Sequence, residues 1–168
     1  MARRKADHVS ETPATQLLRR HGVPFSEHVY DYVERGGTAE SSRQLGVPEH
    51  EVVKTLVMQD EAARPLLVLM HGDREVSTRA LARQIGVKRV EPCSPEAAQR
   101  ASGYRIGGTS PFATRKPMPV YVEQSVLALP RILVNGGQRG YLVRLEPGVL
   151  VSLLGARTVQ CASLSGAQ

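Results

Sequence analysis

The sequence predicts a single α+β domain with a mixed, barrel-like β-sheet flanked by short helices. Its 168 residues are 41% hydrophobic, which supplies enough apolar surface for one compact core. Segments that open with a helix-capping residue alternate with short strand-like runs, and glycine-rich turns divide the final third. The sequence has no repeat, linker or low-complexity segment, so we expect one domain over residues 12–161 with flexible tails at 1–11 and 162–168.

Helix starts are marked by capping residues and by proline at the first helical position. Thr12-Pro13 and Ser94-Pro95 both have this pattern. The turn Gly36-Gly37-Thr38 provides a further cap, and glycines follow the expected helix ends. These signals predict helices at 13–21, from Thr38 to Leu45, from Thr78 to Ile85, at 95–101 and at 147–155.

Strands are predicted where β-branched and other apolar residues form short runs. The two strongest runs, residues 52–58 and 66–70, should pair in one sheet. A hairpin is expected across the cluster Gly136-Gly137-Gln138-Arg139-Gly140. The other predicted strands are 23–30, 74–77, 87–90, 119–123, 131–135 and 141–145.

The charge of the chain favours an anionic partner. Its net charge is +6, its isoelectric point is about 9.7, and only four of its cationic residues are lysines. Arginine matches phosphate in two-point contacts, so a nucleic acid is a reasonable partner. A solvated basic surface that maintains solubility explains the charge equally well.

The cellular compartment is predicted from the cysteines and from the absence of long apolar segments. Cys93 and Cys161 have no neighbouring cysteine or histidine at metal-ligand spacing, and two thiols would make a sparse disulfide framework. No stretch approaches 18 uninterrupted apolar residues. We therefore expect a cytoplasmic protein that does not span a membrane.

Lys54 is the most informative single residue. In an alternating strand it shares a face with Val52, Leu56 and Met58, which are apolar. Its ammonium either reaches solvent at an edge, the more common situation for strand lysines, or lies in a partly desolvated cleft where an anion would stabilise its charge.

Two glycine clusters could approach a ligand with their backbone. In the segment Gly107-Gly108-Thr109-Ser110-Pro111, successive N–H groups can form an anion-binding concavity. In the second cluster, Arg139 is placed at a turn tip from which it could reach a phosphate. Taken alone, each cluster is more often an ordinary turn.

Familiar catalytic signatures are absent from the sequence. The histidines show no metal-like pairing, Ser110 does not lie in a nucleophile elbow, and neither cysteine has an activating neighbour. We therefore predict no metal site and no cysteine nucleophile.

The order of several weak motifs carries a family resemblance. The segments are Thr12-Pro13-Ala14 with Leu17-Leu18, Val23-Pro24-Phe25 with His28-Val29-Tyr30, Val53-Lys54-Thr55-Leu56, Gly103-Tyr104 with Gly107 to Pro111, and Asn135 to Gly140. In this order they resemble the YbaK/EbsC family of aminoacyl-tRNA editing proteins, which is related to the editing domain of bacterial prolyl-tRNA synthetases.

The resemblance implies a deacylase that cleaves the ester between a mischarged amino acid and tRNA, with Cys-tRNA(Pro) as the implied substrate. It places the catalytic lysine at Lys54 and the glycine loop at Gly107 and Gly108. It implies no metal or cofactor. The predicted substrate-binding residues are Tyr30, Thr109, Ser110, Gly136, Gly137 and Arg139.

The partners expected on this basis are aminoacyl-tRNA and prolyl-tRNA synthetase, with no DNA and no membrane. Arg105 and Arg139 are candidates for contacts with the acceptor-stem backbone. The amides near Gly107 and Gly108 would stabilise the developing oxyanion, and the nucleophile would be water or a group of the substrate. Two alternatives remain open, namely a deacylase for another small residue such as alanine on tRNA(Pro), or a non-catalytic module that binds tRNA or a synthetase.

Overall fold

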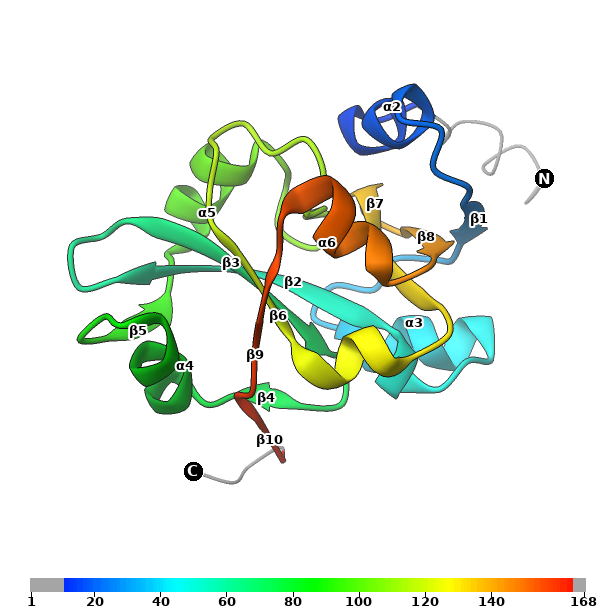
Figure 1. The fold of residues 1–168 in the computed structure, drawn as a ribbon. Coiled ribbons are helices and arrows are strands. Elements are labelled where there is room, and N and C mark those ends of the chain that lie inside the picture. The colour runs from blue at the N-terminus through cyan, green and yellow to red at the C-terminus, as the bar shows by residue number, and fades with distance from the viewer. Residues whose placement is uncertain (1–10, 165–168) are drawn as a thin grey trace.

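The computed structural model describes residues 11–164, which are drawn in Figure 1. As predicted, the Thr12 and Ser94 hydroxyls cap helices that open with proline. Within the described range the helices are α2 (Pro13–Arg20), α3 (Gly37–Leu45), α4 (Thr78–Ile85), α5 (Pro95–Ser102) and α6 (Gly148–Leu154), with the 3-10 helices η1 (Glu49–Glu51) and η2 (Gln124–Ala128).

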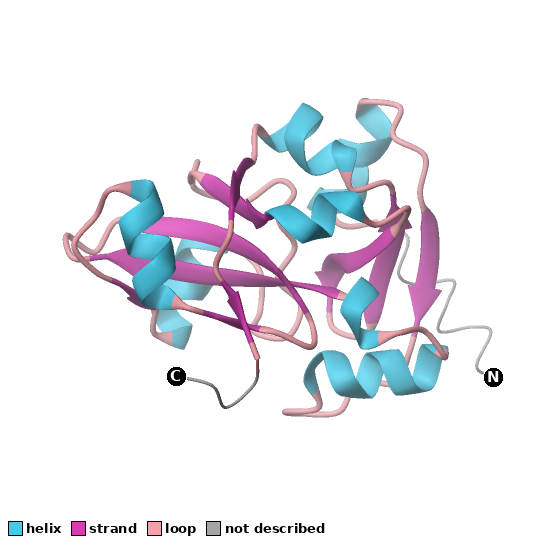
Figure 2. Ribbon diagram, turned by 60° about the horizontal axis from the view of Figure 1, so that its bottom comes forward, coloured by secondary structure: helices cyan, strands magenta, loops and turns pink. Residues whose placement is uncertain are grey.

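The strands confirm the predicted α+β class with a mixed sheet. They divide among three sheets, none of them closed, with the orders β5-β2-β3-β6-β9, β1-β8-β7 and β10-β4. Figure 2 shows the helices arranged around these strands. The strands are β1 (Ser26–Val29), β2 (Val53–Asp60), β3 (Pro65–His71), β4 (Glu75–Val76), β5 (Val90–Pro92), β6 (Val120–Glu123), β7 (Ile132–Gln138), β8 (Tyr141–Leu145), β9 (Arg157–Val159) and β10 (Ala162–Ser163).

The predicted strand pairing and the predicted hairpin are both present. Strands β2 and β3 pair antiparallel along their length, with Lys54 opposite Met70. Strands β7 and β8 pair antiparallel around Arg139 and Gly140, and a bulge interrupts the register between Asn135 and Gln138. Gly140 has φ +76°, a left-handed conformation that glycine adopts without steric cost.

The main core lies between the two larger sheets. Leu67, Leu69 and Val122 from the five-stranded sheet pack in one cluster with Val134 and Val143 from the three-stranded sheet. The sheets approach each other where Val52, just before β2, forms a parallel bridge with Leu133 of β7. This junction sets the distance between the start of β2 and the β7–β8 hairpin, which matters for the site described below.

A second, smaller core covers the other face of the five-stranded sheet. Val68 and Met70, which alternate with Leu67 and Leu69 along β3, pack there with Leu81 of α4. Successive strand residues point to opposite faces, and each face of β3 has a core against it. The sequence of β3 is therefore a nearly continuous run of apolar residues.

Two predictions of local structure are corrected. Thr38 does not cap α3: the N-cap is Gly36, and the Thr38 hydroxyl donates instead to Glu49 Oε2 at 2.7 Å and to the Gly72 carbonyl at 3.2 Å. Tertiary partners therefore replaced the local cap. The strand expected over 87–90 begins at Val90, because the amides of the two preceding residues bind the Glu61 carboxylate.

The end of the chain adds two strands that the sequence patterns did not predict. Strand β9 extends the large sheet in parallel with β6, and β10 pairs with β4, beginning one residue beyond the predicted domain end at 161. Of the predicted tails, residues 1–10 and 165–168 lie outside the described residues. None of the described helices has the length and apolarity needed to cross a bilayer.

Candidate active site

A cavity of about 710 Å³ opens where α3, the start of β2, the first turns of α5 and the β7–β8 hairpin meet. This volume lies within the range of small-molecule sites. Its lining combines aromatic, cationic and backbone groups, and its residues are Tyr30, Tyr32, Val33, Glu34, Arg35, Gly37, Thr38, Glu40, Ser41, Val52, Val53, Lys54, Thr55, Pro95, Gln99, Ile106, Gly107, Thr109, Asn135, Arg139 and Leu142.

Lys54 stands in the wall of this cavity. Leu56 and Met58, on the same face of β2, belong to the second core, so the apolar strand face expected around the lysine is present. The Lys54 side chain is 22% exposed, and its Nζ lies 3.9 Å from Glu75 Oε2. The ammonium is thus partly desolvated, with one carboxylate nearby and room for a substrate anion or carbonyl.

Thr55, the next residue, also lines the cavity. Its hydroxyl oxygen is buried and has no hydrogen-bond partner among the described residues. An unpaired buried hydroxyl typically costs 1–3 kcal/mol. A polar group of a bound substrate would remove that cost, so Thr55 is a candidate binding residue, which the sequence reasoning missed although it follows Lys54 directly.

The loop after α5 is held rigidly by its own side chains. The Tyr104 hydroxyl donates to the Phe112 carbonyl at 2.6 Å, and burial raises the pKa of Tyr104 to about 12. Ser110 is fully buried, and its Oγ accepts from the Phe112 amide at 3.2 Å. Ser110, predicted as a substrate-binding residue, therefore supports the loop and does not line the cavity.

The two glycines of this loop have different environments. Gly107 lines the cavity with φ +88°, and a Cβ added there would lie 2.5 Å from the Tyr32 hydroxyl oxygen. Gly108 is buried outside the cavity, and its amide donates to the Arg105 carbonyl at 2.9 Å. A Cβ added there would lie 2.8 Å from the backbone nitrogen of Arg139. Gly107 presents backbone to a ligand, whereas Gly108 lets the loop pack against the hairpin.

Two amides of the loop remain available to a ligand. In the described part of the chain, the N–H groups of Gly107 and Thr109 have no hydrogen-bond partner, and both residues line the cavity. Unpaired amides of residues that line one cavity can bind an anion or a developing oxyanion.

Arg139 connects the hairpin tip to the loop and to the segment after β1. Its Nε donates to the Ile106 carbonyl at 2.7 Å, and its guanidinium lies 4.7 Å from the centre of the Tyr32 ring. Such a cation–π contact is worth about 0.5–1 kcal/mol at an exposed site. Arg139 therefore holds the rim of the cavity, and Tyr32 is a second residue that sequence reasoning missed.

Gly136 and Gly137 are placed behind the cavity. The Gly136 carbonyl accepts from the Thr12 hydroxyl at 2.6 Å, and the Gly137 amide donates to Asn135 Oδ1 at 2.6 Å. Neither glycine is a lining residue, whereas Asn135 is, and its Nδ2 donates to the Gly107 carbonyl at 3.3 Å. Asn135 was visible in the sequence as the first residue of its cluster but was given no role.

Tyr30 also lines the cavity. Its amide donates to the Gly140 carbonyl at 3.0 Å, which fixes it to the hairpin. Burial, and to a lesser extent the neighbouring Tyr32, raise the pKa of Tyr30. The hydroxyl is therefore neutral at physiological pH and can donate a hydrogen bond.

The carboxylates of the cavity offer no evident general base. Glu40 accepts hydrogen bonds from Arg43 at 2.5 Å and from Gln44 at 2.6 Å, and these contacts lower its pKa. Among the described residues no histidine lines the cavity. The arrangement can thus bind and polarise an ester more readily than it can deprotonate a nucleophile.

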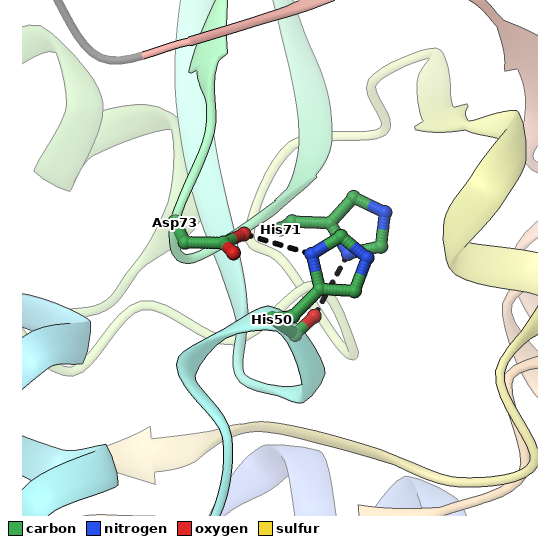
Figure 3. Close-up of side chains that lie close together, drawn as sticks. All are labelled: His50, His71 and Asp73. Atoms are coloured by element: carbon green, nitrogen blue, oxygen red, sulfur yellow. Dashed lines mark hydrogen bonds and ion pairs between the residues drawn. The ribbon is translucent and has the colours of Figure 1, made fainter.

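A cluster of His50, His71 and Asp73 lies next to the site but outside the cavity lining (Figure 3). The sequence gave no sign of this grouping. Their potential ligand atoms lie within 4.8 Å of one another, but the two imidazoles are stacked 3.7 Å apart at 8°. Metal ions bind in the plane of each ring at about 2.0–2.1 Å, so two parallel stacked rings cannot direct their lone pairs to one ion.

Hydrogen bonds give this cluster a structural role. His50 Nδ1 lies 2.9 Å from Asp73 Oδ1, while His71 Nδ1 lies 2.8 Å from the His50 carbonyl and its Nε2 lies 2.7 Å from Ser125 Oγ. A carbonyl only accepts, so His71 carries its proton on Nδ1. The cluster fastens η1 and η2 to the end of β3.

Comparison with known proteins identifies relatives over most of the chain. The family model of the aminoacyl-tRNA editing domain matches residues 34–153. EbsC of Enterococcus faecalis, named as a Cys-tRNA(Pro)/Cys-tRNA(Cys) deacylase, is 30% identical over 154 residues, which are 91% of this chain and 93% of EbsC. A proline–tRNA ligase of Desulfotalea psychrophila is 30% identical over 97 residues, 58% of this chain but 16% of the ligase.

Solved structures share the fold. A crystal structure described as the hypothetical protein APE2540 superimposes with a TM-score of 0.82 at 24% identity, covering 90% of this chain and 100% of that one. Another, described as a trans-editing enzyme for prolyl tRNA synthetase, has a TM-score of 0.77 at 23% identity and covers 91% and 98% of the two chains.

Proposed function

This chain belongs to the family of aminoacyl-tRNA editing domains, and we propose that it acts as a free-standing deacylase for mischarged tRNA. The observation that carries the proposal is the cavity of about 710 Å³, which joins the Lys54 ammonium to the unpaired amides of Gly107 and Thr109. An aminoacyl ester is already activated. Its hydrolysis depends mainly on positioning and on stabilising the charge that develops on the carbonyl oxygen.

In the proposed mechanism, Lys54 anchors the ester or the terminal ribose, and the Gly107 and Thr109 amides donate to the oxyanion. Each such donor contributes roughly 3–4 kcal/mol in well-studied acyl-transfer sites. The nucleophile adds to the carbonyl carbon and loses a proton, the bond from that carbon to the ribose oxygen breaks, and the ribose oxygen takes up the proton and leaves as a hydroxyl. Gly108 acts indirectly, by keeping the loop against the hairpin.

The nucleophile is water or a group of the substrate itself. Glu40 is held by Arg43 and Gln44 in the ionised state, which makes it a weak base. The other carboxylate of the lining, Glu34, is exposed at the rim. This distribution favours assistance by the substrate, through a cysteine thiol or a tRNA hydroxyl.

Cysteine attached to tRNA(Pro) is the proposed substrate. The support is the 30% identity to EbsC over 91% of this chain, together with the similarity of part of the chain to proline–tRNA ligases. Those ligases also make prolyl-tRNA synthetase the proposed protein partner. Alanine on tRNA(Pro) is the alternative within the same reaction class.

The experiment is a hydrolysis panel with purified Cys-tRNA(Pro), Ala-tRNA(Pro), Ser-tRNA and Pro-tRNA(Pro). We expect the fastest release with Cys-tRNA(Pro) and none above background with Pro-tRNA(Pro). Fastest release of alanine would replace cysteine in the proposal. No release from any of the four, with tRNA binding intact, would leave the binding module as the correct alternative.

A further inference from the structure

We propose that a depression formed by Arg100, Arg105 and Arg115 binds the phosphates of the single-stranded 3′ end of tRNA, next to the aminoacyl cavity. This inference rests on the proposed function for the identity of the RNA. The depression has a volume of about 430 Å³, and its other lining residues are Glu96, Gln99, Gly103 and Tyr104.

The three arginines come from different segments that the fold brings together. Arg100 lies in the last turn of α5, Arg105 lies in the loop that follows, and Arg115 lies beyond the buried Phe112. The Arg115 amide donates to the Ser102 carbonyl at 3.0 Å, and a Cβ added to Gly103 would lie 3.7 Å from Arg115 Nε. Arg115 is therefore folded back over the end of α5.

The charges of this depression are not neutralised within the protein. All three arginines are exposed, and over residues 11–164 none of them forms an ion pair with a carboxylate. Glu96 is the one acidic residue of the lining. Gathering like charges without partners is unfavourable unless an anion binds, and guanidinium groups match phosphate oxygens in two-point contacts.

The depression and the aminoacyl cavity are adjacent. Gln99 lines both of them, and its Oε1 accepts from the Ile106 amide at 3.2 Å. Arg105 lines the depression while Ile106, the next residue, lines the cavity and is 41% exposed. An RNA strand whose 3′-terminal adenosine enters the cavity would pass over Arg105 and Ile106. One unstacked base would then lie against Ile106, and the phosphates on the 5′ side of the terminal adenosine would lie over the arginines.

A second basic depression provides a direct comparison. It is lined by Arg79, Arg83, Lys88 and Arg89 and has a volume of about 280 Å³. Val90, which lines it, pairs with Asp60, six residues along β2 from Lys54, or about 20 Å at the usual rise of a strand. Here Arg89 has an acidic partner, Glu91, at 3.7 Å. Its distance from Lys54 makes this depression the comparison, and favours the first depression as the one that serves the cavity.

The test compares two triple variants that remove the same charge. One is Arg100→Gln with Arg105→Gln and Arg115→Gln, and the matched control is Arg79→Gln with Arg83→Gln and Lys88→Gln. The probe is a short single-stranded RNA ending in CCA, and its dissociation constant is measured by fluorescence anisotropy over a range of salt concentrations. All six side chains are exposed, so thermal unfolding should be unchanged in both variants.

We expect the first variant to bind the RNA about tenfold more weakly or worse, and the control to bind within about twofold of wild type. For wild type, three phosphate contacts to single-stranded RNA predict a slope of about −2 when the logarithm of the association constant is plotted against the logarithm of the salt concentration. In the first variant this slope should be close to zero. Equal losses in the two variants, or a larger loss in the control, would overturn the proposal.

A second substrate separates this inference from the proposed function. Cysteinyl adenosine, esterified on its ribose, carries no phosphate. The first variant should hydrolyse it at the wild-type rate while its KM for Cys-tRNA(Pro) rises. An equal loss on both substrates would mean that the arginines act on the cavity, which contradicts the proposal. If wild type hydrolyses neither substrate, the proposed function fails, and the RNA-binding comparison still decides the phosphate site.

Discussion

At the scale of single residues, the site depends on a lysine that the strand pattern makes conspicuous. Lys54 is flanked in the sheet by apolar neighbours, yet its ammonium faces a cavity and has Glu75 at 3.9 Å. Lysine is seldom placed in such surroundings without a partner or a ligand. Its function and its contribution to stability can therefore be separated by mutation.

Lys54→Ala should reduce deacylation by about a hundredfold or more, because a charge contact to the reacting ester is lost. Thermal unfolding should stay close to wild type. The matched control is Lys88→Ala, at an exposed position outside the aminoacyl cavity. Activity of Lys54→Ala within about threefold of wild type corresponds to only about 0.65 kcal/mol of barrier and would remove Lys54 from the mechanism.

At the scale of elements, the loop after α5 and the β7–β8 hairpin form one unit around the cavity. Arg139 and Asn135 reach from the hairpin to the carbonyls of Ile106 and Gly107. Gly108 fits against the hairpin backbone with no space for a side chain. The shape of the cavity rim is thus decided by contacts between two segments about 30 residues apart.

Gly108→Ala should disturb this unit. The alanine Cβ would lie 2.8 Å from the backbone nitrogen of Arg139, so the loop must move away from the hairpin. This should lower the free energy of unfolding by about 1–3 kcal/mol. We expect kcat/KM to fall with it. Gly148→Ala in α6, where nothing lies within 4 Å, is the control and should leave both quantities near wild type. Similar effects in the two variants would show that the loop can relax freely.

The hairpin is also tied to the first helix. The Thr12 hydroxyl accepts from the Thr15 amide at 3.0 Å as an N-cap and donates to the Gly136 carbonyl at 2.6 Å. An N-cap alone contributes about 1 kcal/mol to the free energy of unfolding. Loss of the Thr12 hydroxyl would also leave the buried Gly136 carbonyl without its donor, at a further cost.

Thr12→Ala should therefore lower the free energy of unfolding by about 2–3 kcal/mol, measured by urea denaturation. Ser94→Ala removes a comparable cap from α5, at an exposed position, and should cost only about 1 kcal/mol. Thr12→Ser keeps both hydrogen bonds and should recover most of the loss. Equal losses for the two alanine variants would mean that the bond to Gly136 adds nothing.

At the scale of the whole molecule, buried polar contacts fasten the segments that connect the sheets. His71, at the end of β3, is 1% exposed and binds both the His50 carbonyl and Ser125. Its pKa is lowered, chiefly by burial; the hydrogen bond to the His50 carbonyl and the charges of Asp73 and Glu123 oppose this, while the His50 imidazole adds to it. Folding therefore keeps His71 neutral at a pH where the unfolded chain begins to bind a proton.

This difference predicts how stability depends on pH. The pKa of His71 is lower in the folded state than the value of 6.5 in the unfolded chain. Its contribution to the free energy of unfolding is therefore fully present above pH 6.5 and is lost as the pH falls toward the folded-state pKa. We expect wild type to lose stability between pH 7.5 and 5.5 in urea titrations. His71→Gln should show a smaller decrease, whatever its stability at pH 7.5. The exposed His21→Gln is the control, and a decrease in His71→Gln equal to wild type would contradict the assignment.

Much of the fold could be predicted because its signals are local. Capping residues with proline fixed the starts of α2 and α5, glycines fixed helix ends, and apolar runs identified β2 and β3, since backbone preferences and side-chain alternation act over a few residues. Thr38 was misread for the complementary reason: its hydroxyl found partners at Glu49 and Gly72, and no local pattern reports such distant contacts.

By itself, the sequence determined the domain class, the position of Lys54 on an apolar strand and the order of motifs that defines the family. Only the tertiary structure decided which residues face the cavity. It placed Gly107 and Thr109 there, moved Gly108, Ser110, Gly136 and Gly137 into supporting positions, and added Tyr32, Thr55 and Asn135. It also gathered Arg100, Arg105 and Arg115 into one depression. The physical reason is that a loop's role depends on what packs against it, and those partners come from segments far away in the chain.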